Sequence, residues 1–175
     1  MAEGTTTEVE YVDAVKQVIR ESHTDSVGVK SVGVGRDPEA VLRKAVELRA
    51  AAEESGEPYD WCCILVDVDE HTRLAACLAR AAQLGVHVVV SNPCFEIWLL
   101  WHVEDYRRHC DASELADRLK VHGVAGKHLP ARFPFRSYEA AVARAQRADE
   151  ALASGRQGPN PSSAMPVLIG LMGST

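Results

Sequence analysis

The sequence has few cysteines, no long hydrophobic run and no excess of positive charge, and each absence excludes a class of protein. Its five cysteines are an odd number without a CxxC pair, which argues against a zinc site and a disulfide framework, so we expect reduced thiols. The most apolar stretches, IWLLWHV and PVLIGLM, are too short to span a bilayer, and the opening MAEGTTTEVE lacks the features of a secretory signal. We therefore expect a cytoplasmic protein with no membrane partner.

Positive charge is in deficit over the chain as a whole. Nineteen Lys and Arg against 25 Asp and Glu give a formal net charge of −6, which disfavours a nucleic-acid binder that relies on charge alone. The exception is the stretch 118–136, here called the basic segment, which contains no Asp or Glu. Its cationic residues are Arg118, Lys120, Lys127, Arg132 and Arg136. This segment could bind phosphates, and a solvated loop is an equally good explanation.

The length of 175 residues, with 46% apolar and 25% charged residues, fits one globular domain over 1–175. Two unbroken apolar runs, 61–66 and 86–90, are typical of strands buried by helices on both faces. A third stretch, 27–34, is a weak strand candidate because of its glycines. Helices are expected over 8–20, from 38 to just before Gly56, and over 72–84, 94–103, 111–122 and 137–154, with a short apolar element at 165–172. Asp37 and Asp111 are expected to cap the second and the fifth of these helices. The alternation predicts an α/β fold with a parallel sheet.

A pair of aspartates follows the first apolar run. Asp67 and Asp69 are two residues apart, so on an extended strand their side chains point to the same side. They come at the carboxyl end of that strand, the edge at which open parallel sheets hold their ligands. Two carboxylates with waters completing the shell suit Mg²⁺ or Mn²⁺. The pattern predicts a metal site, while a structural role, with Asp69 capping the next helix, stays open.

Glu96 is another carboxylate expected at this edge of the sheet. It lies on the very apolar helix predicted over 94–103, with Asn92 as the cap and Pro93 in the first turn. A carboxylate there needs a cation or a hydrogen-bond donor, although the positive end of the helix alone also explains it. Cys94 near the helix start could be a nucleophile, and a buried core cysteine is the alternative.

Four segments in the same order resemble the RloB-like family, whose members are described as Toprim-like proteins of bacterial defence loci. The segments are EGTTTEVEY, LVDVDEH, SNPCFEIWLLWH and GPNPSS. The resemblance covers nearly the whole chain and implies a Toprim-like three-layer fold with a mostly parallel central sheet. The family has an apolar strand before its EG motif, whereas here only Met1 and Ala2 precede Glu3, so the first strand is expected to be truncated. Pairing with a second copy of the chain, as a homo-oligomer, is one way to cover such a sheet.

The resemblance also implies roles for particular residues. Glu3, Asp67 and Asp69 would bind Mg²⁺ (or Mn²⁺) for phosphodiester chemistry, with Glu96 as a further catalytic carboxylate.

Lys127 falls where family members carry a basic residue, and with Arg132 it is expected to bind the substrate. The implied function is a metal-dependent nuclease or related phosphodiester hydrolase that acts on DNA or RNA in anti-phage defence (abortive infection). The resemblance further implies an ATPase partner.

Two other functions stay open. A non-catalytic partner subunit with a vestigial Toprim site is favoured by the truncated strand and disfavoured by the carboxylates at Asp67, Asp69 and Glu96. An aspartyl phosphatase of the haloacid dehalogenase type would use Asp67 in a DxDx[TV] motif. His71 stands where Thr or Val is expected in that motif, and no paired-aspartate motif follows.

Overall fold

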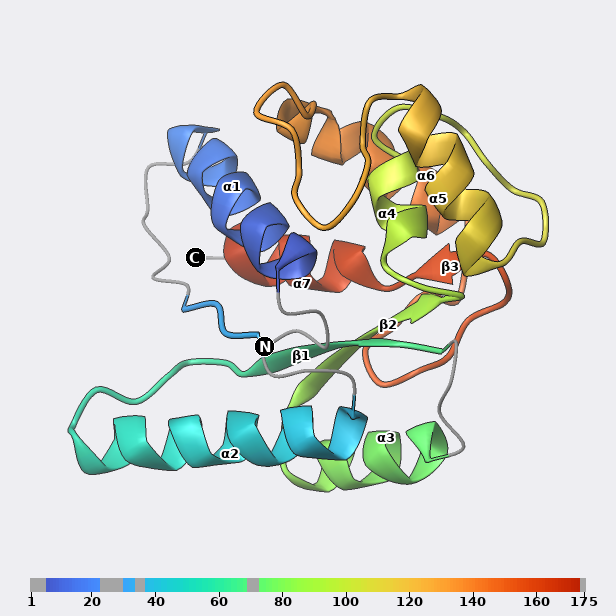
Figure 1. Cartoon of the computed structure of the whole chain (residues 1–175). Helices are drawn as coiled ribbons and strands as arrows, with labels where there is room; N and C mark the ends of the chain where they lie inside the picture. Colours follow the sequence, from blue (N-terminus) through green and yellow to red (C-terminus); the bar gives the residue numbers. More distant parts are fainter. Residues whose placement is uncertain (1–5, 23–29, 34–36, 69–72, 174–175) are drawn as a thin grey trace.

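A small mixed sheet separates two layers of helices (Figure 1). The computed structural model describes residues 6–22, 30–33, 37–68 and 73–173. Within them the strand order is β1-β2-β3. The strands are β1 (Cys63–Asp67), β2 (His87–Asn92) and β3 (Ser162–Ser163). The β1–β2 pair is parallel, with Asp67 opposite Ser91, whereas β3 is antiparallel to β2. The sheet of the described residues is therefore small and mixed, with the longer strand pair parallel, and a mostly parallel sheet stays a prediction.

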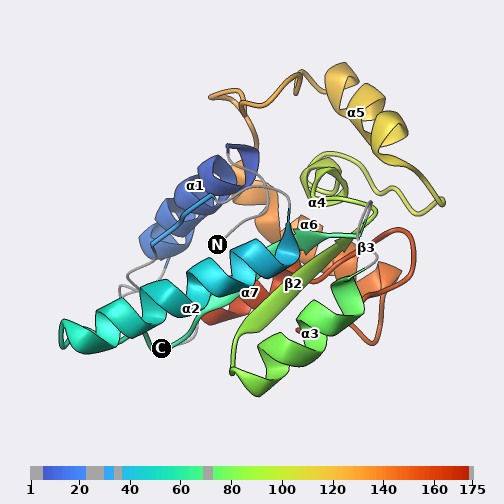
Figure 2. The same ribbon diagram turned by 60° about the horizontal axis from the view of Figure 1, so that its bottom comes forward.

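The helices cover the sheet on both faces. They are α1 (Thr7–Ser22), α2 (Pro38–Glu54), α3 (Leu74–Gln83), α4 (Glu96–Leu100), α5 (Ala112–Val121), α6 (Tyr138–Ala148) and α7 (Met165–Gly173), with a 3-10 turn at Phe135–Ser137. Figure 2 shows α2 and α3 together on one side of β2. The remaining helices lie on the other side of the sheet. The three-layer arrangement of helix, sheet and helix is confirmed.

Two hydrophobic cores explain why β1 and β2 are apolar at nearly every position. Successive strand residues point to opposite faces, so Ile64 and Val66 pack with α2 and α3 in one core. Leu65 and Val89 belong to the other core, which is built from α1, α4, α5, α6 and α7. Because both faces are buried, neither strand has a polar side, as the sequence indicated.

Strand β2 is hydrogen-bonded along both edges. One edge pairs with β1, and the other meets a stretch from the C-terminal part of the chain. The Val88 amide donates to the Ser154 hydroxyl at 2.9 Å, and the Val88 carbonyl accepts from the Gly155 amide at 2.8 Å. Further along, Ala164 donates its amide to the Val90 carbonyl at 3.0 Å, beside the two residue pairs of β3. Both hydrogen-bonding edges of β2 are thus paired.

The carboxylate caps predicted in front of two helices are confirmed. Asp37 accepts the Glu39 amide at 3.3 Å in front of α2, and Asp111 accepts the Glu114 amide at 2.9 Å in front of α5. The tail is the helix α7, and α1 and α3 lie where helices were expected, with Thr72 outside the described residues. Half of the weak strand candidate lies outside them too, and Gly33 in its described part forms a single bridge.

The helix expected over 94–103 was wrong at both ends. Strand β2 continues through Ser91 and Asn92, and α4 covers only Glu96–Leu100. Asn92 is no helix cap, because its amide donates to the Gly158 carbonyl at 2.9 Å. The Ser91 hydroxyl pairs with that of Ser163 at 2.9 Å. The C-terminal loop therefore holds both residues in the sheet. Glu96 is the first residue of α4, whereas the longer predicted helix would have put it one turn inside.

The helix expected over 137–154 also ends early, at Ala148. Asp149 takes an extended conformation, with φ −144° and ψ 97°, and its buried carboxylate pairs with Arg156. The residues after it then run back along β2. No helix in the described part of the chain is both long enough and apolar enough to cross a bilayer.

Gly158 is expected to tolerate no side chain. A Cβ there would lie 2.4 Å from the Asp149 carboxylate and 2.5 Å from the Ser162 hydroxyl. Both residues are buried, so Gly158→Ala should cost about 1–3 kcal/mol of unfolding free energy through overpacking. Urea denaturation measures this, with Gly170→Ala as the control because a Cβ at Gly170 meets nothing within 4 Å. Equal stability of the two variants would contradict the prediction.

Candidate functional site

Asp67 stands at the carboxyl end of β1, where the parallel pair ends. It is half-buried opposite Ser91 of β2. The following amide, that of Val68, donates to the Ser91 carbonyl at 3.0 Å and to the Pro93 carbonyl at 3.1 Å. The chain after β1 is therefore tied to the chain after β2, and the two strand ends meet at one edge.

Glu96 and Cys94 come to this edge from β2. Cys94 is buried between β2 and α4, and Glu96 is half-buried at the start of α4. The pKa of the Cys94 thiol is well above its usual range, chiefly through burial, then through the negative charge of Glu96 and its hydrogen bond with the thiol, and through the charge of Asp67. The two carboxylates thus act on the same thiol.

The Cys94 thiol does not fit the alternative of a nucleophile. A raised pKa keeps the group protonated, and the thiolate is the reactive form. The sequence expectation of a core cysteine fits its 5% exposure. The raised pKa of Cys94 instead shows that the negative charges of Asp67 and Glu96 act on the same thiol.

Two of the four predicted catalytic carboxylates, Glu3 and Asp69, lie outside the described residues. Among the residues that are described, no group of three His, Cys, Asp or Glu side chains is arranged to hold a metal ion. Of the four predicted carboxylates, the two that are described, Asp67 and Glu96, have oxygen donors of the kind that Mg²⁺ and Mn²⁺ prefer. The metal site remains a prediction that needs Glu3 and Asp69 to complete it.

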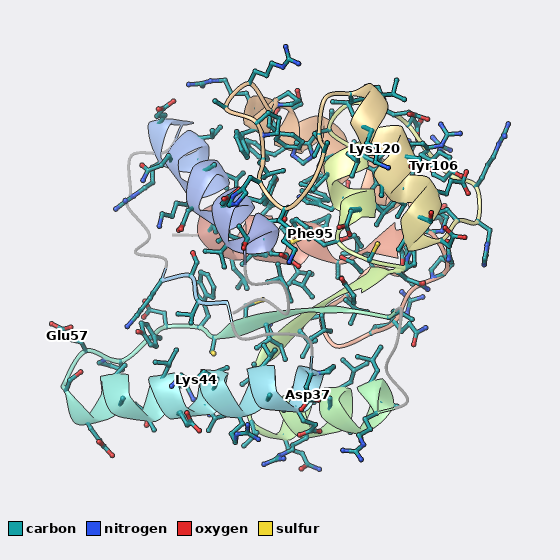
Figure 3. The ribbon with its side chains drawn as sticks, in the orientation of Figure 1. Asp37, Lys44, Glu57, Phe95, Tyr106 and Lys120 are labelled. Atoms are coloured by element: carbon teal, nitrogen blue, oxygen red, sulfur yellow. The ribbon has the colours of Figure 1, made fainter. Side chains whose placement is uncertain are left out.

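Cations of the basic segment fall into two groups. Three of them pair with acids: Arg118 with Glu104 at 2.6 Å, Lys120 with Asp117 at 2.7 Å, and Arg136 with Glu21. Figure 3 labels Lys120, which lies in the last turn of α5. The exposed side chains of Lys127 and Arg132 form no ion pair with any part of the chain that the structure describes. These two are the residues that the sequence singled out for substrate binding.

The loop that carries Lys127 packs against the start of α1. The Thr7 hydroxyl donates to the Lys127 carbonyl at 2.7 Å. The Glu10 carboxylate accepts the Leu129 amide at 2.9 Å and lies 2.6 Å from His128 Nδ1. These two hydrogen bonds hold the pKa of Glu10 below its usual value. No pattern in the sequence indicated this contact, because a carboxylate in the first turn of a helix is explained by the helix dipole alone.

Aromatic rings fill the space between α1 and α4. Tyr11 lies edge-on to Phe95 and Trp98, with ring centroids 5.7 and 6.1 Å away (Figure 3 labels Phe95). Its hydroxyl is 3.1 Å from Nε2 of the buried His102, whose Nδ1 is 3.0 Å from the Trp98 carbonyl. A carbonyl can only accept, so Nδ1 carries the proton and Nε2 accepts from Tyr11. Trp98, Trp101 and Phe95 are buried core residues.

Comparison with known proteins gives one match. Neither the curated proteins nor the solved structures contain a significant match to this chain. The family model described as RloB-like protein matches residues 1–172. That range includes the strand ends with Asp67 and Glu96, the basic segment and the loop that closes β2. By this match over nearly its whole length, the chain belongs to the RloB-like protein family.

Proposed function

We propose that this protein is a metal-dependent nuclease, or a related phosphodiester-processing enzyme, with a Toprim-like arrangement of its site. The observation that carries the proposal is that Asp67, at the carboxyl end of β1, and Glu96, at the start of the helix that follows β2, both bring negative charge to the buried Cys94. Ligands of open α/β sheets bind at this edge. Carboxylate oxygens are the donors that Mg²⁺ and Mn²⁺ prefer, which favours a metal at this edge.

In this proposal Asp67, Asp69 and Glu3 would hold Mg²⁺ or Mn²⁺. The ion would neutralise the phosphate and lower the pKa of a bound water. Glu3 would serve as a ligand or as a general acid or base, and Glu96 would be a catalytic group that is not a ligand.

Lys127 and Arg132 would bind the phosphate backbone of DNA or RNA. Cations that already pair with carboxylates must break those pairs before they can contact phosphate. Lys127 and Arg132 have no such pair to break among the described residues, so they are the better placed cations of the basic segment. The net charge of −6 fits a protein that engages nucleic acid with help, and we propose an ATPase partner in anti-phage defence.

Gly123 is expected to matter for Arg132. A Cβ at Gly123 would lie 3.1 Å from an Arg132 guanidinium nitrogen. Gly123→Ala should therefore displace the guanidinium and weaken binding of fluorescein-labelled DNA a few-fold, besides costing about 1 kcal/mol of stability for its φ of +79°. Gly56→Ala is the matched control, because Gly56 has a φ of +78° and open space around it. Equal DNA affinity of the two variants would contradict this role.

The first experiment is calorimetric titration of Mn²⁺ into the wild-type chain and into the Asp67→Asn/Asp69→Asn double variant. Stoichiometric binding that the double variant loses would support the site, and cleavage of DNA and RNA would then be assayed with Mg²⁺ or Mn²⁺, with and without the ATPase. A folded wild-type chain that binds no Mn²⁺ would refute the catalytic proposal. A non-catalytic partner subunit would then be the better explanation.

A further inference from the structure

We propose that Glu10 is a positioning residue for nucleic-acid binding, whose carboxylate holds the loop at His128 and Leu129 against α1 so that the side chains of Lys127 and Arg132 face a phosphate backbone. The inference rests on the proposed function, because it takes nucleic acid as the ligand of the basic segment. Glu10 itself would not contact the ligand.

Three consecutive residues of the basic segment are attached to the first turn of α1. Thr7 binds the Lys127 carbonyl at 2.7 Å, and Glu10 binds the His128 ring at 2.6 Å and the Leu129 amide at 2.9 Å. The attachment joins parts of the chain that are about 120 residues apart in sequence. It fixes the backbone on which Lys127 stands, while the side chains of Lys127 and Arg132 stay exposed.

Such an attachment makes the free energy of nucleic-acid binding more favourable, because it orders the loop before the ligand binds. A loop that is ordered before the ligand arrives loses less conformational entropy on binding than a mobile loop. Lys127 and Arg132 gain from this, since within the described residues no acidic partner orients either side chain. The backbone hydrogen bonds to α1 therefore supply the order that ion pairs supply for Arg118 and Arg136.

The negative charge of Glu10 repels the phosphates of the same ligand. A carboxylate near phosphate lowers affinity, so a mere bystander at this position would bind nucleic acid more tightly once neutralised. A positioning residue would do the opposite. The sign of the change therefore separates the two roles, which a general loss of stability does not.

The experiment measures binding of fluorescein-labelled single-stranded DNA by anisotropy over a range of KCl concentrations, without metal. The charge control is Asp13→Asn, also on α1, because Asp13 pairs with Lys16 at 2.7 Å and Ser31 at 2.8 Å and not with the basic segment. The ligand control is Lys127→Gln. Thr7→Val removes one attachment without any change of charge, and circular dichroism confirms that each variant is folded.

Glu10→Ala is expected to bind roughly fivefold more weakly than the wild type, with an unchanged slope of log affinity against log salt. Glu10→Gln keeps an acceptor for the Leu129 amide and should fall between the two. Thr7→Val should also weaken binding, with the slope unchanged. Lys127→Gln should reduce the slope by about 0.7, since one phosphate contact is lost on a single strand.

Tighter binding by Glu10→Ala, as by Asp13→Asn, would overturn the inference while the response of Lys127→Gln still supported the proposed ligand. Unchanged affinity and slope in Lys127→Gln and Arg132→Gln would remove the basic segment from nucleic-acid binding. That result would refute the ligand and the inference together, and Mn²⁺ binding at Asp67 would be untouched by it.

Discussion

Glu96→Gln is expected to lower metal-dependent cleavage by about 10²–10⁴-fold while Mn²⁺ binding stays intact. Glu96 lies at the first position of α4, and its charge and that of Asp67 both act on the Cys94 thiol. In the proposed site it is a catalytic group and not a ligand, so its loss should reduce turnover and leave the stoichiometry of Mn²⁺ unchanged. Cleavage of labelled DNA and RNA gives the first quantity, and calorimetry gives the second.

Glu57→Gln is the matched control for this variant. Glu57 is exposed on the loop that leads into β1, far from α4 (Figure 3), and its replacement removes the same charge. Its activity should equal that of the wild type. If Glu96→Gln cleaved as fast as Glu57→Gln, Glu96 would have no catalytic role. If it lost Mn²⁺ as well, Glu96 would be a ligand.

Stability is expected to fall by about 3 kcal/mol as the pH drops from about 6.5 to about 4, because of His102. Burial, then the positive charge of Arg144, lowers the pKa of His102 to about 4, although its hydrogen bond to the Trp98 carbonyl opposes the shift. Below pH 6.5 the unfolded chain takes up a proton that the folded chain refuses. The unfolded state is therefore favoured increasingly until the folded pKa is reached.

Urea denaturation at several pH values between neutral and pH 4 measures this effect. His102→Gln should have a smaller slope of stability against pH, since Gln does not titrate and can still bond to Tyr11 and Trp98. His109→Gln, at an exposed position, should keep the wild-type slope. Identical slopes in all three proteins would show that His102 is not the group responsible.

The features that the sequence predicted best are those set by local chemistry. The runs around Leu65 and Val89 are strands buried on both faces, and Asp37 and Asp111 cap the helices that they precede. In each case neighbouring residues decide the conformation. The start of α4 was mistaken because Asn92-Pro93 looks like a local helix start, whereas a partner about 70 residues away, the 158–163 loop, draws Ser91 and Asn92 into β2.

The candidate site was predictable to the same extent. That Asp67 and Glu96 both act on Cys94 near one sheet edge follows from two parallel strands in succession, which the two apolar runs predicted. That Glu10 holds the basic segment could not be foreseen, since the contact joins α1 to a loop without regular structure. Such a pairing depends on how two distant pieces pack and has no local pattern.

The closure of β2 by residues 154–164 has a consequence for synthesis of the chain on the ribosome. Until that stretch has emerged, Val88 and Val90 lack the backbone partners of their second edge, and the strand is an open template for pairing with other chains. Strand β2, which is synthesised early, therefore stays incompletely paired until residues 154–164, which are synthesised late, reach it. A nascent chain whose residues 154–164 have not yet emerged should be a client of chaperones, whereas one in which they have emerged can already complete its sheet.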